Sequence, residues 1–164
     1  MQVAVIADIH DQQERVFDAL ALIEERQIDH VLLLGDFCAP FTMRLFSHFP
    51  GQLFVVFGNG DGDRFRATKI AYEVFGKRMT LFGEFAQFNL EQRRIAMIHD
   101  NEIGHALAET ERYDIVLYGH DHRWHESRIG NTLLLNPGTL GGKGAPPTFA
   151  IIDLTTLAVE KITL

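Results

Sequence analysis

The chain has 164 residues, of which 46% are hydrophobic and 23% are charged, and its formal net charge is −7. This length and composition fit a single domain over residues 1–164 that can bury a core without disulfides. The acidic balance excludes a protein that coats nucleic acid or an anionic membrane by bulk electrostatics, but it allows a phosphorylated substrate because bound cations change the local field.

The cysteine content and the first residues bear on location. A single cysteine, Cys38, excludes an internal disulfide and is typical of a reducing cytoplasm. The chain opens with a strand-like run at 3–7 that has no basic segment and no cleavage pattern, and its apolar runs are too short to cross a bilayer. We therefore expect a cytoplasmic protein without a membrane partner.

The first half of the chain alternates between apolar strands and helical patterns. Residues 12–26 carry Val16, Leu20 and Ile23 at helical spacing, which predicts an amphipathic helix. The other elements predicted here are buried strands at 2–7, 30–34 and 52–57, a short helix at 41–48 after the break at Pro40, and a helix at 62–75 that ends at Gly76.

The second half is mostly strands. A hairpin that turns at Glu91-Gln92 is predicted from strands at 84–90 and 93–98. The remaining predicted elements are a helix at 101–110, strands at 115–118, 124–129, 132–135, 148–153 and 157–163, and a long surface loop at 136–147 where Gly and Pro cluster. Near-continuous apolar strands require cover on both faces, so the expected class is α/β, with two packed β-sheets flanked by helices.

Five of the apolar strands stop at residues that can bind a metal. These residues are Asp8, His10, Asp36, Asn59, His99, His120 and His122. Because ligands of open α/β sheets bind beyond the carboxyl ends of the strands, we expect them to converge on one patch. Glycines precede three of them at Gly35, Gly58 and Gly119, where a sharp turn and close backbone approach are expected.

The mixture of ligands indicates the metal. Carboxylate, imidazole and amide groups without a thiolate suit Mn²⁺, Fe²⁺, Zn²⁺ or Ni²⁺ in a reactive site better than a structural zinc. Seven residues are too many for one ion, and a shared carboxylate could bridge two ions about 3.5–4 Å apart, the spacing that serves in-line phosphoryl displacement. We predict two divalent ions, with Mn²⁺ first and Ni²⁺, Fe²⁺, Zn²⁺ or Mg²⁺ as alternatives.

The motifs, in this order, resemble those of the calcineurin-like metallophosphoesterase superfamily. They are Asp8-Ile9-His10, Gly35-Asp36, Gly58-Asn59-Gly60-Asp61, His99 and Gly119-His120-Asp121-His122. The short chain and the segment Asn136-Pro137-Gly138-Thr139 are similar to the small YfcE-type phosphodiesterase branch. The resemblance spans residues 8–139. It implies a four-layer α/β/β/α sandwich that hydrolyses a small phosphodiester or phosphoester.

The resemblance also implies roles for the seven ligands. One metal would be held by Asp8, His10, Asp36 and His122, and the other by Asp36, Asn59, His99 and His120. Asp36 would bridge the two ions, and a hydroxide between them would attack phosphorus. Asp36, Asn59 and His99 would thereby be catalytic, together with Asp61, which would orient Asn59 or a neighbouring group.

Three positions depart from the family pattern. Gly60 stands where many relatives carry a histidine that assists the leaving group, so water or another residue would have to supply that proton. Asp100 stands where Gly is common, and Asp121 stands where a small hydroxyl residue is common. A carboxylate at Asp100 could alter metal affinity or repel polyanionic substrates. These departures affect the expected substrate more than the expected activity.

Several residues have an ordinary structural interpretation beside the functional one. Taken singly, each motif could be a turn or a helix cap. Cys38 could be a ligand or pack as a small apolar group, and Asp63 could serve only as helix N-terminal charge. The basic residues Arg64, Arg66 and Lys143 could contact phosphate or lie on a solvated face. The histidines outside the motifs, expected to be surface or packing residues, are His30, His48, His105 and His125.

Two other functions compete with a phosphodiesterase. The retromer Vps29 subunit shares the implied fold and acts in protein assembly, so a binding scaffold with weak or no catalysis is one alternative. A phosphomonoesterase or nucleotidase with the same chemistry is the other. The phenylalanines near 82–88 are interpreted as core, and an exposed part of them would allow a homodimer or homotetramer.

Overall fold

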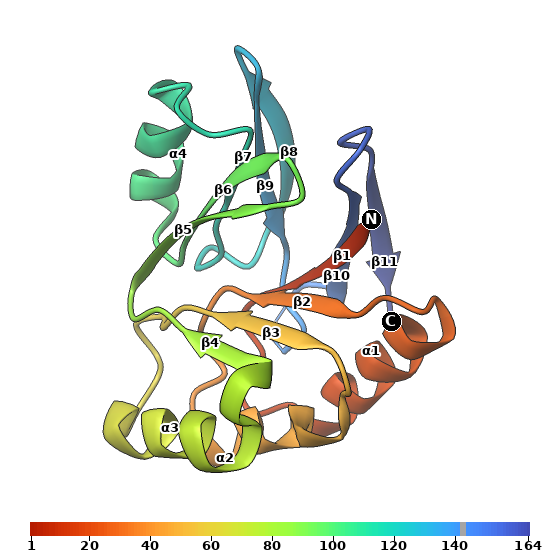
Figure 1. Ribbon diagram of the computed structural model, residues 1–164, viewed down its shortest axis with the longest axis vertical. Coiled ribbons are helices and arrows are strands. Elements are labelled where there is room, and N and C mark those ends of the chain that lie inside the picture. Colours follow the sequence, from red (N-terminus) through yellow and green to blue (C-terminus); the bar gives the residue numbers. More distant parts are fainter. Residues whose placement is uncertain (142–143) are drawn as a thin grey trace.

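Two β-sheets lie face to face at the centre of the computed structural model, which describes residues 1–141 and 144–164 (Figure 1). The six-stranded sheet has the order β11 (Val159–Thr163), β10 (Thr148–Asp153), β1 (Gln2–Ile6), β2 (His30–Leu33), β3 (Gln52–Val55), β4 (Met79–Leu81). The five-stranded sheet has the order β5 (Phe85–Leu90), β6 (Arg93–Ile98), β7 (Ile115–Leu117), β9 (Thr132–Pro137), β8 (Trp124–Ile129).

The strands that carry the predicted ligands run parallel within each sheet. β1 pairs with β2, β2 with β3, and β3 with β4 in parallel, whereas β10 is antiparallel to β1. In the second sheet β6, β7 and β9 are parallel neighbours. The carboxyl ends of β1, β2 and β3 therefore share one edge, and those of β6 and β7 share another, as the sequence pattern required.

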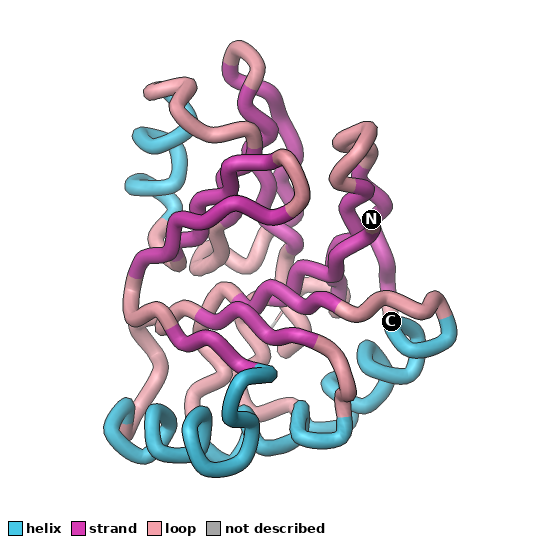
Figure 2. Tube along the Cα trace, in the orientation of Figure 1, coloured by secondary structure: helices cyan, strands magenta, loops and turns pink. Residues whose placement is uncertain are grey.

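Helices cover the two outer faces (Figures 1 and 2). Beneath the six-stranded sheet lie α1 (Gln13–Glu25), α2 (Pro40–Arg44) and α3 (Arg64–Ile70), and α4 (Asn101–Glu109) lies on the five-stranded sheet. Helix α1 buries Val16, Leu20 and Ile23 as its periodicity predicted. The α/β/β/α order of layers is therefore confirmed.

The space between the sheets is filled by apolar side chains from both. Val5 and Leu32 of the first sheet belong to the same buried cluster as Met97, Leu117 and Leu135 of the second, and each of the five is fully buried. This packing holds the two sheets, and the loops that follow their strands, in a fixed relation.

The structure differs from two of the predicted elements and adds one strand that was not predicted. The predicted helix at 62–75 is α3 followed by a π-helical turn at Ala71–Phe75, and the short strand β4 was not predicted at all. The expected surface loop at 136–147 is wrong in its first part: β9 extends to Pro137, and residues 136–140 are buried. Polar side chains in this segment find hydrogen-bond partners beneath the loops of the site, so its Gly and Pro content does not place it in solvent. Lys143 lies outside the described residues.

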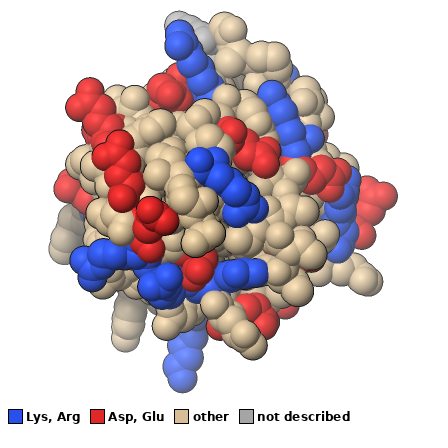
Figure 3. All heavy atoms as spheres, turned by 90° about the horizontal axis from the view of Figure 1, so that it is seen from above, with Lys and Arg blue, Asp and Glu red and all other residues tan. Residues whose placement is uncertain are grey.

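The surface carries charged side chains of both signs. Basic and acidic side chains lie interspersed among uncharged atoms on the face shown in Figure 3. Within the described parts of the chain, no helix has the length and apolar character needed to cross a membrane.

Candidate metal centre

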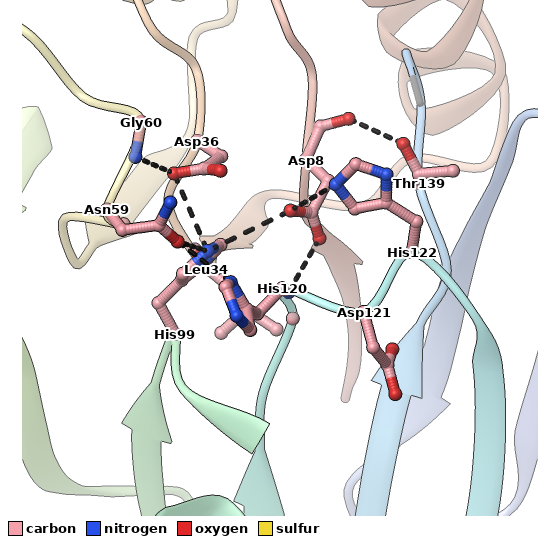
Figure 4. A network of polar contacts seen from close by, with 12 residues as sticks. Asp8, Leu34, Asp36, Asn59, Gly60, His99, His120, Asp121, His122 and Thr139 are labelled. Atoms are coloured by element: carbon pink, nitrogen blue, oxygen red, sulfur yellow. Dashed lines mark hydrogen bonds and ion pairs between the residues drawn. The ribbon is translucent and has the colours of Figure 1, made fainter. Parts of the chain in front are cut away.

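The seven predicted ligands come together where five strands end. Figure 4 shows the side chains of Asp8, Asp36, Asn59, His99 and His120 converging from different loops. The Nε2 atoms of His10 and His122 lie 3.0 Å apart, and that of His122 lies 3.3 Å from Oδ1 of Asp8. The predicted convergence is therefore present in the geometry.

Asp8 holds a buried oxygen that has no hydrogen-bond partner among residues 1–141 and 144–164. Its Oδ2 accepts the backbone N–H of His120 at 3.0 Å, but its Oδ1 accepts no hydrogen bond from these residues. That oxygen instead faces imidazole Nε2 atoms at 3.3 Å (His122), 3.9 Å (His10) and 3.9 Å (His99). Burial raises the pKa of Asp8 from 3.8 to about 7. A buried acceptor surrounded by ring nitrogens fits a cation, which would satisfy the oxygen and the nitrogens together.

His99 is oriented by a backbone carbonyl. Its Nδ1–H donates to the carbonyl oxygen of Leu34 at 2.7 Å, so in the neutral ring the lone pair is on Nε2. That nitrogen faces oxygens of Asn59 at 3.1 Å and Asp36 at 3.5 Å. Burial acts to lower the pKa of His99, but hydrogen bonding to Asp36 and the charges of Asp8 and Asp36 outweigh it, and the pKa is raised. The lone pair and these oxygens need a proton or a metal ion between them.

Asp36 reaches two different histidines. Its Oδ1 lies 3.5 Å from Nε2 of His99 and its Oδ2 lies 3.7 Å from Nε2 of His10, while Gly60 N–H donates to Oδ1 at 2.7 Å. Burial alone would raise the pKa of Asp36. Hydrogen bonding to His99 and its charge outweigh burial, so the pKa lies below the ordinary value. Asp36 is therefore ionised at neutral pH and has oxygens available on two sides.

His10 and His122 present their ring nitrogens to one another. Their rings are in edge contact, with centroids 4.8 Å apart. Burial and the neighbouring His10 lower the pKa of His122, which favours the neutral, metal-binding form of the ring. Cys38 lies on the other side of His10, with Sγ 3.4 Å from Nδ1, so the thiol contacts the outer nitrogen of that ring.

Asn59 connects the remaining imidazole to the cluster. Its Oδ1 lies 2.8 Å from Nδ1 of His120 and 3.1 Å from Nε2 of His99. Two sets of three residues have ligand atoms within 4.8 Å of one another. These sets are Asp8, His10 and His122, and Asp8, Asp36 and His99. The donor chemistry and the unsatisfied oxygen both fit bound divalent ions.

The backbone at these ligands is strained. Asp8, His10, Asp36, His120 and His122 all have φ between 46° and 78°, in the left-handed region that non-glycine residues rarely occupy. β7 ends at Leu117, so the last two histidines face the centre because of this backbone conformation rather than strand alternation. Strain of this kind concentrates at functional sites.

Glycines allow the loops to meet. A Cβ at Gly58 would lie 2.2 Å from Oδ1 of Asp36, and one at Gly119 would lie 2.8 Å from Oδ2 of Asp8. The close approach expected at these two positions is therefore present.

Asp61 and Asp63 have different roles. Asp61 accepts backbone N–H groups from Asp36 at 3.1 Å, Cys38 at 2.7 Å and Gly58 at 2.7 Å, and so ties together the loops after β2 and β3. Its contacts are those of a positioning residue for these loops, and the orienting role toward Asn59 stays a prediction. Asp63 accepts the N–H of Arg66 and caps α3, which agrees with its structural interpretation.

Sequence reasoning missed supporting residues at 136–139. The amide of Asn136 donates to the carbonyl of Gly119 at 3.0 Å and to Asp121 at 2.7 Å, and the hydroxyl of Thr139 donates to the carbonyl of Asp8 at 2.7 Å. These bonds hold two ligand loops from below. The motif itself was noticed, but nothing in its composition showed that the segment would be buried.

The remaining polar positions lie around the centre. Asp121 points away from the ligand cluster (Figure 4), and Asp100 caps α4 by accepting Ile103 N–H. Of the other histidines, His30 contacts Asp29 and His48 is exposed. The ring of His105 stacks on that of His125, and His125 forms a hydrogen bond with the hydroxyl of Tyr118. The packing and surface roles expected for these four histidines are therefore confirmed.

Comparison with known proteins identifies a matching family model and a curated relative. Residues 1–157 match the calcineurin-like phosphoesterase superfamily domain. The chain is 22% identical to phosphodiesterase MJ0936 of Methanocaldococcus jannaschii, over 100% of this chain and 99% of that protein.

Solved structures share the fold over nearly the whole chain. A structure described as a novel archaeal phosphodiesterase has a TM-score of 0.93 at 22% identity and full coverage of both chains. The phosphoesterase YfcE from E. coli has a TM-score of 0.66 at 16% identity, with 99% and 98% coverage. Wild-type Vps29 from Entamoeba histolytica, complexed with Zn²⁺, has a TM-score of 0.69 at 20% identity, with 100% and 98% coverage.

Proposed function

The chain belongs to the calcineurin-like phosphoesterase superfamily and is a metal-dependent phosphoric ester hydrolase, and from this premise we propose that it cleaves phosphodiesters at a dinuclear metal centre. The main support for the proposal is the buried Oδ1 of Asp8, which finds no hydrogen-bond partner in the part of the chain that the structure describes and faces imidazole nitrogens of His10, His99 and His122. Such an oxygen is costly in a folded protein unless a cation binds it.

We assign the ligands to two ions that share Asp36. Asp8, His10, Asp36 and His122 would hold one ion, and Asp36, Asn59, His99 and His120 would hold the other. The placement of the two Asp36 oxygens toward different histidines supports the bridging role. Mn²⁺ remains the first choice of metal, with Ni²⁺, Fe²⁺, Zn²⁺ and Mg²⁺ as alternatives.

The protein's part in the chemistry is to hold the candidate ligands in fixed orientations. When bound, two divalent ions supply a hydroxide nucleophile at neutral pH and neutralise charge that develops on the phosphoryl oxygens. The Leu34 carbonyl fixes the ring of His99, and Gly60 N–H fixes a carboxylate oxygen of Asp36. Asp61 holds the loops that carry Asp36 and Asn59.

The leaving group receives no imidazole from the loop after β3, because residue 60 is glycine. A Cβ at Gly60 would lie 3.0 Å from Oδ2 of Asp36, so the position is also close to that carboxylate. We infer that a leaving oxygen needing little protonation, or one protonated by water, is preferred. This favours esters with acidic leaving alcohols over esters of ordinary alcohols.

Metal binding alone does not separate an enzyme from a scaffold of this fold, because the Entamoeba histolytica Vps29 structure holds Zn²⁺. The test must therefore measure turnover. We expect the Mn²⁺-loaded protein to hydrolyse bis(p-nitrophenyl) phosphate faster than p-nitrophenyl phosphate. A metal-loaded protein without turnover on either ester would favour the scaffold, and faster hydrolysis of the monoester would favour a phosphomonoesterase.

The bridging role is tested by replacing Asp36. We expect Asp36→Ala to lose bound metal and diester turnover together, whereas Asp18→Ala, at an exposed position on α1, keeps both. Metal content is measured by mass spectrometry of the purified proteins after equilibration with Mn²⁺. Wild-type turnover by Asp36→Ala would contradict the proposed centre. A cytoplasmic location and a homodimer or homotetramer remain predictions from the sequence.

A further inference from the structure

A pocket of about 300 Å³ opens beside the candidate centre. Its lining includes three candidate ligands, Asn59, His99 and His120, and three apolar side chains, Phe57, Ile98 and Ile103. Ligand atoms and apolar walls therefore share one hollow, the combination that is typical of a site for an organic molecule.

Arg64 is the one lysine or arginine among the described residues that line this pocket, and its charge is already paired. Arg64 donates from Nη1 to Glu84 at 2.5 Å and from Nη2 to the carbonyl of Gly58 at 2.9 Å, and its guanidinium lies over the ring of Phe57, 5.1 Å from the centroid. Asp100 also lines the pocket. Outside the metal ligands, this lining therefore carries one cation against two carboxylates and does not favour a second phosphate.

Ile103 forms an apolar rim on this pocket. Asp100 accepts the Ile103 N–H at 2.9 Å and starts α4, which places Ile103 in the first turn of that helix. The Ile103 side chain is 50% exposed although it belongs to a pocket that also contains His99. An isoleucine left half in solvent at such a rim has apolar surface available to a bound group.

We propose that this pocket binds an uncharged aromatic ring carried by the phosphodiester, against Ile103 and the Arg64 guanidinium that lies over Phe57, and that it disfavours a second anionic group. The inference rests on the proposed function for the position of the phosphate, and it adds the class of organic group. Arg64 serves in this proposal as a wall of the pocket and not as a phosphate-binding group, because its guanidinium is paired with Glu84. A ring gains apolar contact there, whereas a phosphate dianion meets Glu84 and Asp100.

The test compares two diesters of equal charge. Diphenyl phosphate and dimethyl phosphate are titrated calorimetrically into the Mn²⁺-loaded protein, and we expect diphenyl phosphate to bind about tenfold more tightly. Ile103→Asp should remove that preference and leave thermal unfolding unchanged. Because the new carboxylate lies in the pocket of the candidate ligands, both diesters are titrated into protein saturated with Mn²⁺. Phe17→Asp is the matched control, because Phe17 is 51% exposed on α1, and it should keep the preference.

A second variant tests the charge argument. Glu84→Gln frees Arg64, so binding of the dianion phenyl phosphate should become several-fold tighter while that of diphenyl phosphate stays close to wild type. No gain for phenyl phosphate in this variant would contradict the neutralising role of Glu84.

The outcomes separate this inference from the proposed function. Equal affinity of the wild-type protein for the two diesters, or a preference that survives Ile103→Asp, overturns the ring site even if bis(p-nitrophenyl) phosphate is hydrolysed. A ring preference that Ile103→Asp abolishes, in a protein without turnover, supports the ring site and counts against the hydrolase proposal.

Discussion

Replacing Asp8 by asparagine should stabilise the metal-free protein and remove its stabilisation by metal. The Asp8 carboxylate is fully buried, and burial raises its pKa from 3.8 to about 7. Above pH 7 its ionised form is therefore about 4 kcal/mol less favourable in the folded protein than in the unfolded chain. Asparagine has nearly the same shape without the charge, so we expect Asp8→Asn to gain about 2–4 kcal/mol at pH 8 in EDTA.

The sign of the pH dependence follows from the same pKa. Between pH 3.8 and about 7 the folded protein binds a proton at Asp8 more tightly than the unfolded chain does, so the wild-type stability falls as pH rises through this window. The asparagine variant lacks this contribution, and its curve should be flatter. Protonation of nearby histidines affects both proteins, so the difference between the two curves is the quantity to measure.

Urea unfolding followed by circular dichroism, at pH 5 and pH 8, measures both effects. In EDTA the free energy of unfolding of Asp8→Asn should exceed that of the wild type, and the difference should be larger at pH 8 than at pH 5. With Mn²⁺ the order should reverse, because a ligand that binds only the folded state stabilises it by an amount that grows with the logarithm of the ratio of ligand concentration to Kd. Asp18→Asn is the control at an exposed aspartate. A metal-free Asp8→Asn protein less stable than wild type at pH 8 would refute the reasoning.

Three further predictions test the surroundings of the centre. Gly58→Ala should weaken Mn²⁺ binding in calorimetry about 10–100-fold, because the new Cβ would lie 2.2 Å from Oδ1 of Asp36, whereas Gly62→Ala, whose Cβ would meet only the Cys38 carbonyl oxygen at 4.0 Å among the described atoms, should bind like wild type. Asn136→Ala should weaken Mn²⁺ binding about tenfold by freeing the Gly119 loop, and unchanged affinity would contradict that supporting role. Burial raises the pKa of the Cys38 thiol from 9.0 to about 11, so iodoacetamide at pH 7.5 should label the native protein about 100-fold more slowly than the urea-unfolded protein; equal rates would contradict this.

The sequence predicted the ligands because their placement follows from local patterns. Val3–Ala7 and Leu32–Leu34 are short apolar runs. Such runs predict buried strands, and the ends of buried strands reach either solvent or a ligand. Once the strands are parallel, the polar residues that follow them share an edge. Asp8, Asp36 and Asn59 could therefore be grouped without knowledge of any contact between them.

What could not be predicted depends on contacts between distant segments. β4 has three residues and no pattern of its own, and it is defined by pairing Met79 with Leu53. The segment at Asn136 and Thr139 is buried because its side chains bond Gly119 and Asp8. A Gly- and Pro-rich composition is the same whether such a segment lies in solvent or under a site, so only the tertiary partners decide.

The features that destabilise this centre in the metal-free protein are the same ones that favour the binding of a metal ion. Five candidate ligands, among them Asp36 and His120, hold left-handed backbone conformations, Asp8 keeps an oxygen without a hydrogen-bond partner in the described part of the chain, and the lone pair of His99 faces oxygens. Each strained backbone position costs the folded protein roughly 1–3 kcal/mol, in addition to the cost of the buried Asp8 carboxylate, and the two packed sheets have to hold the loops against these costs. A bound cation removes the electrostatic part and leaves the backbone strain. Metal affinity and fold stability are therefore linked through Asp8. A substitution at this residue that stabilises the metal-free protein has to destabilise the metal-bound protein relative to wild type.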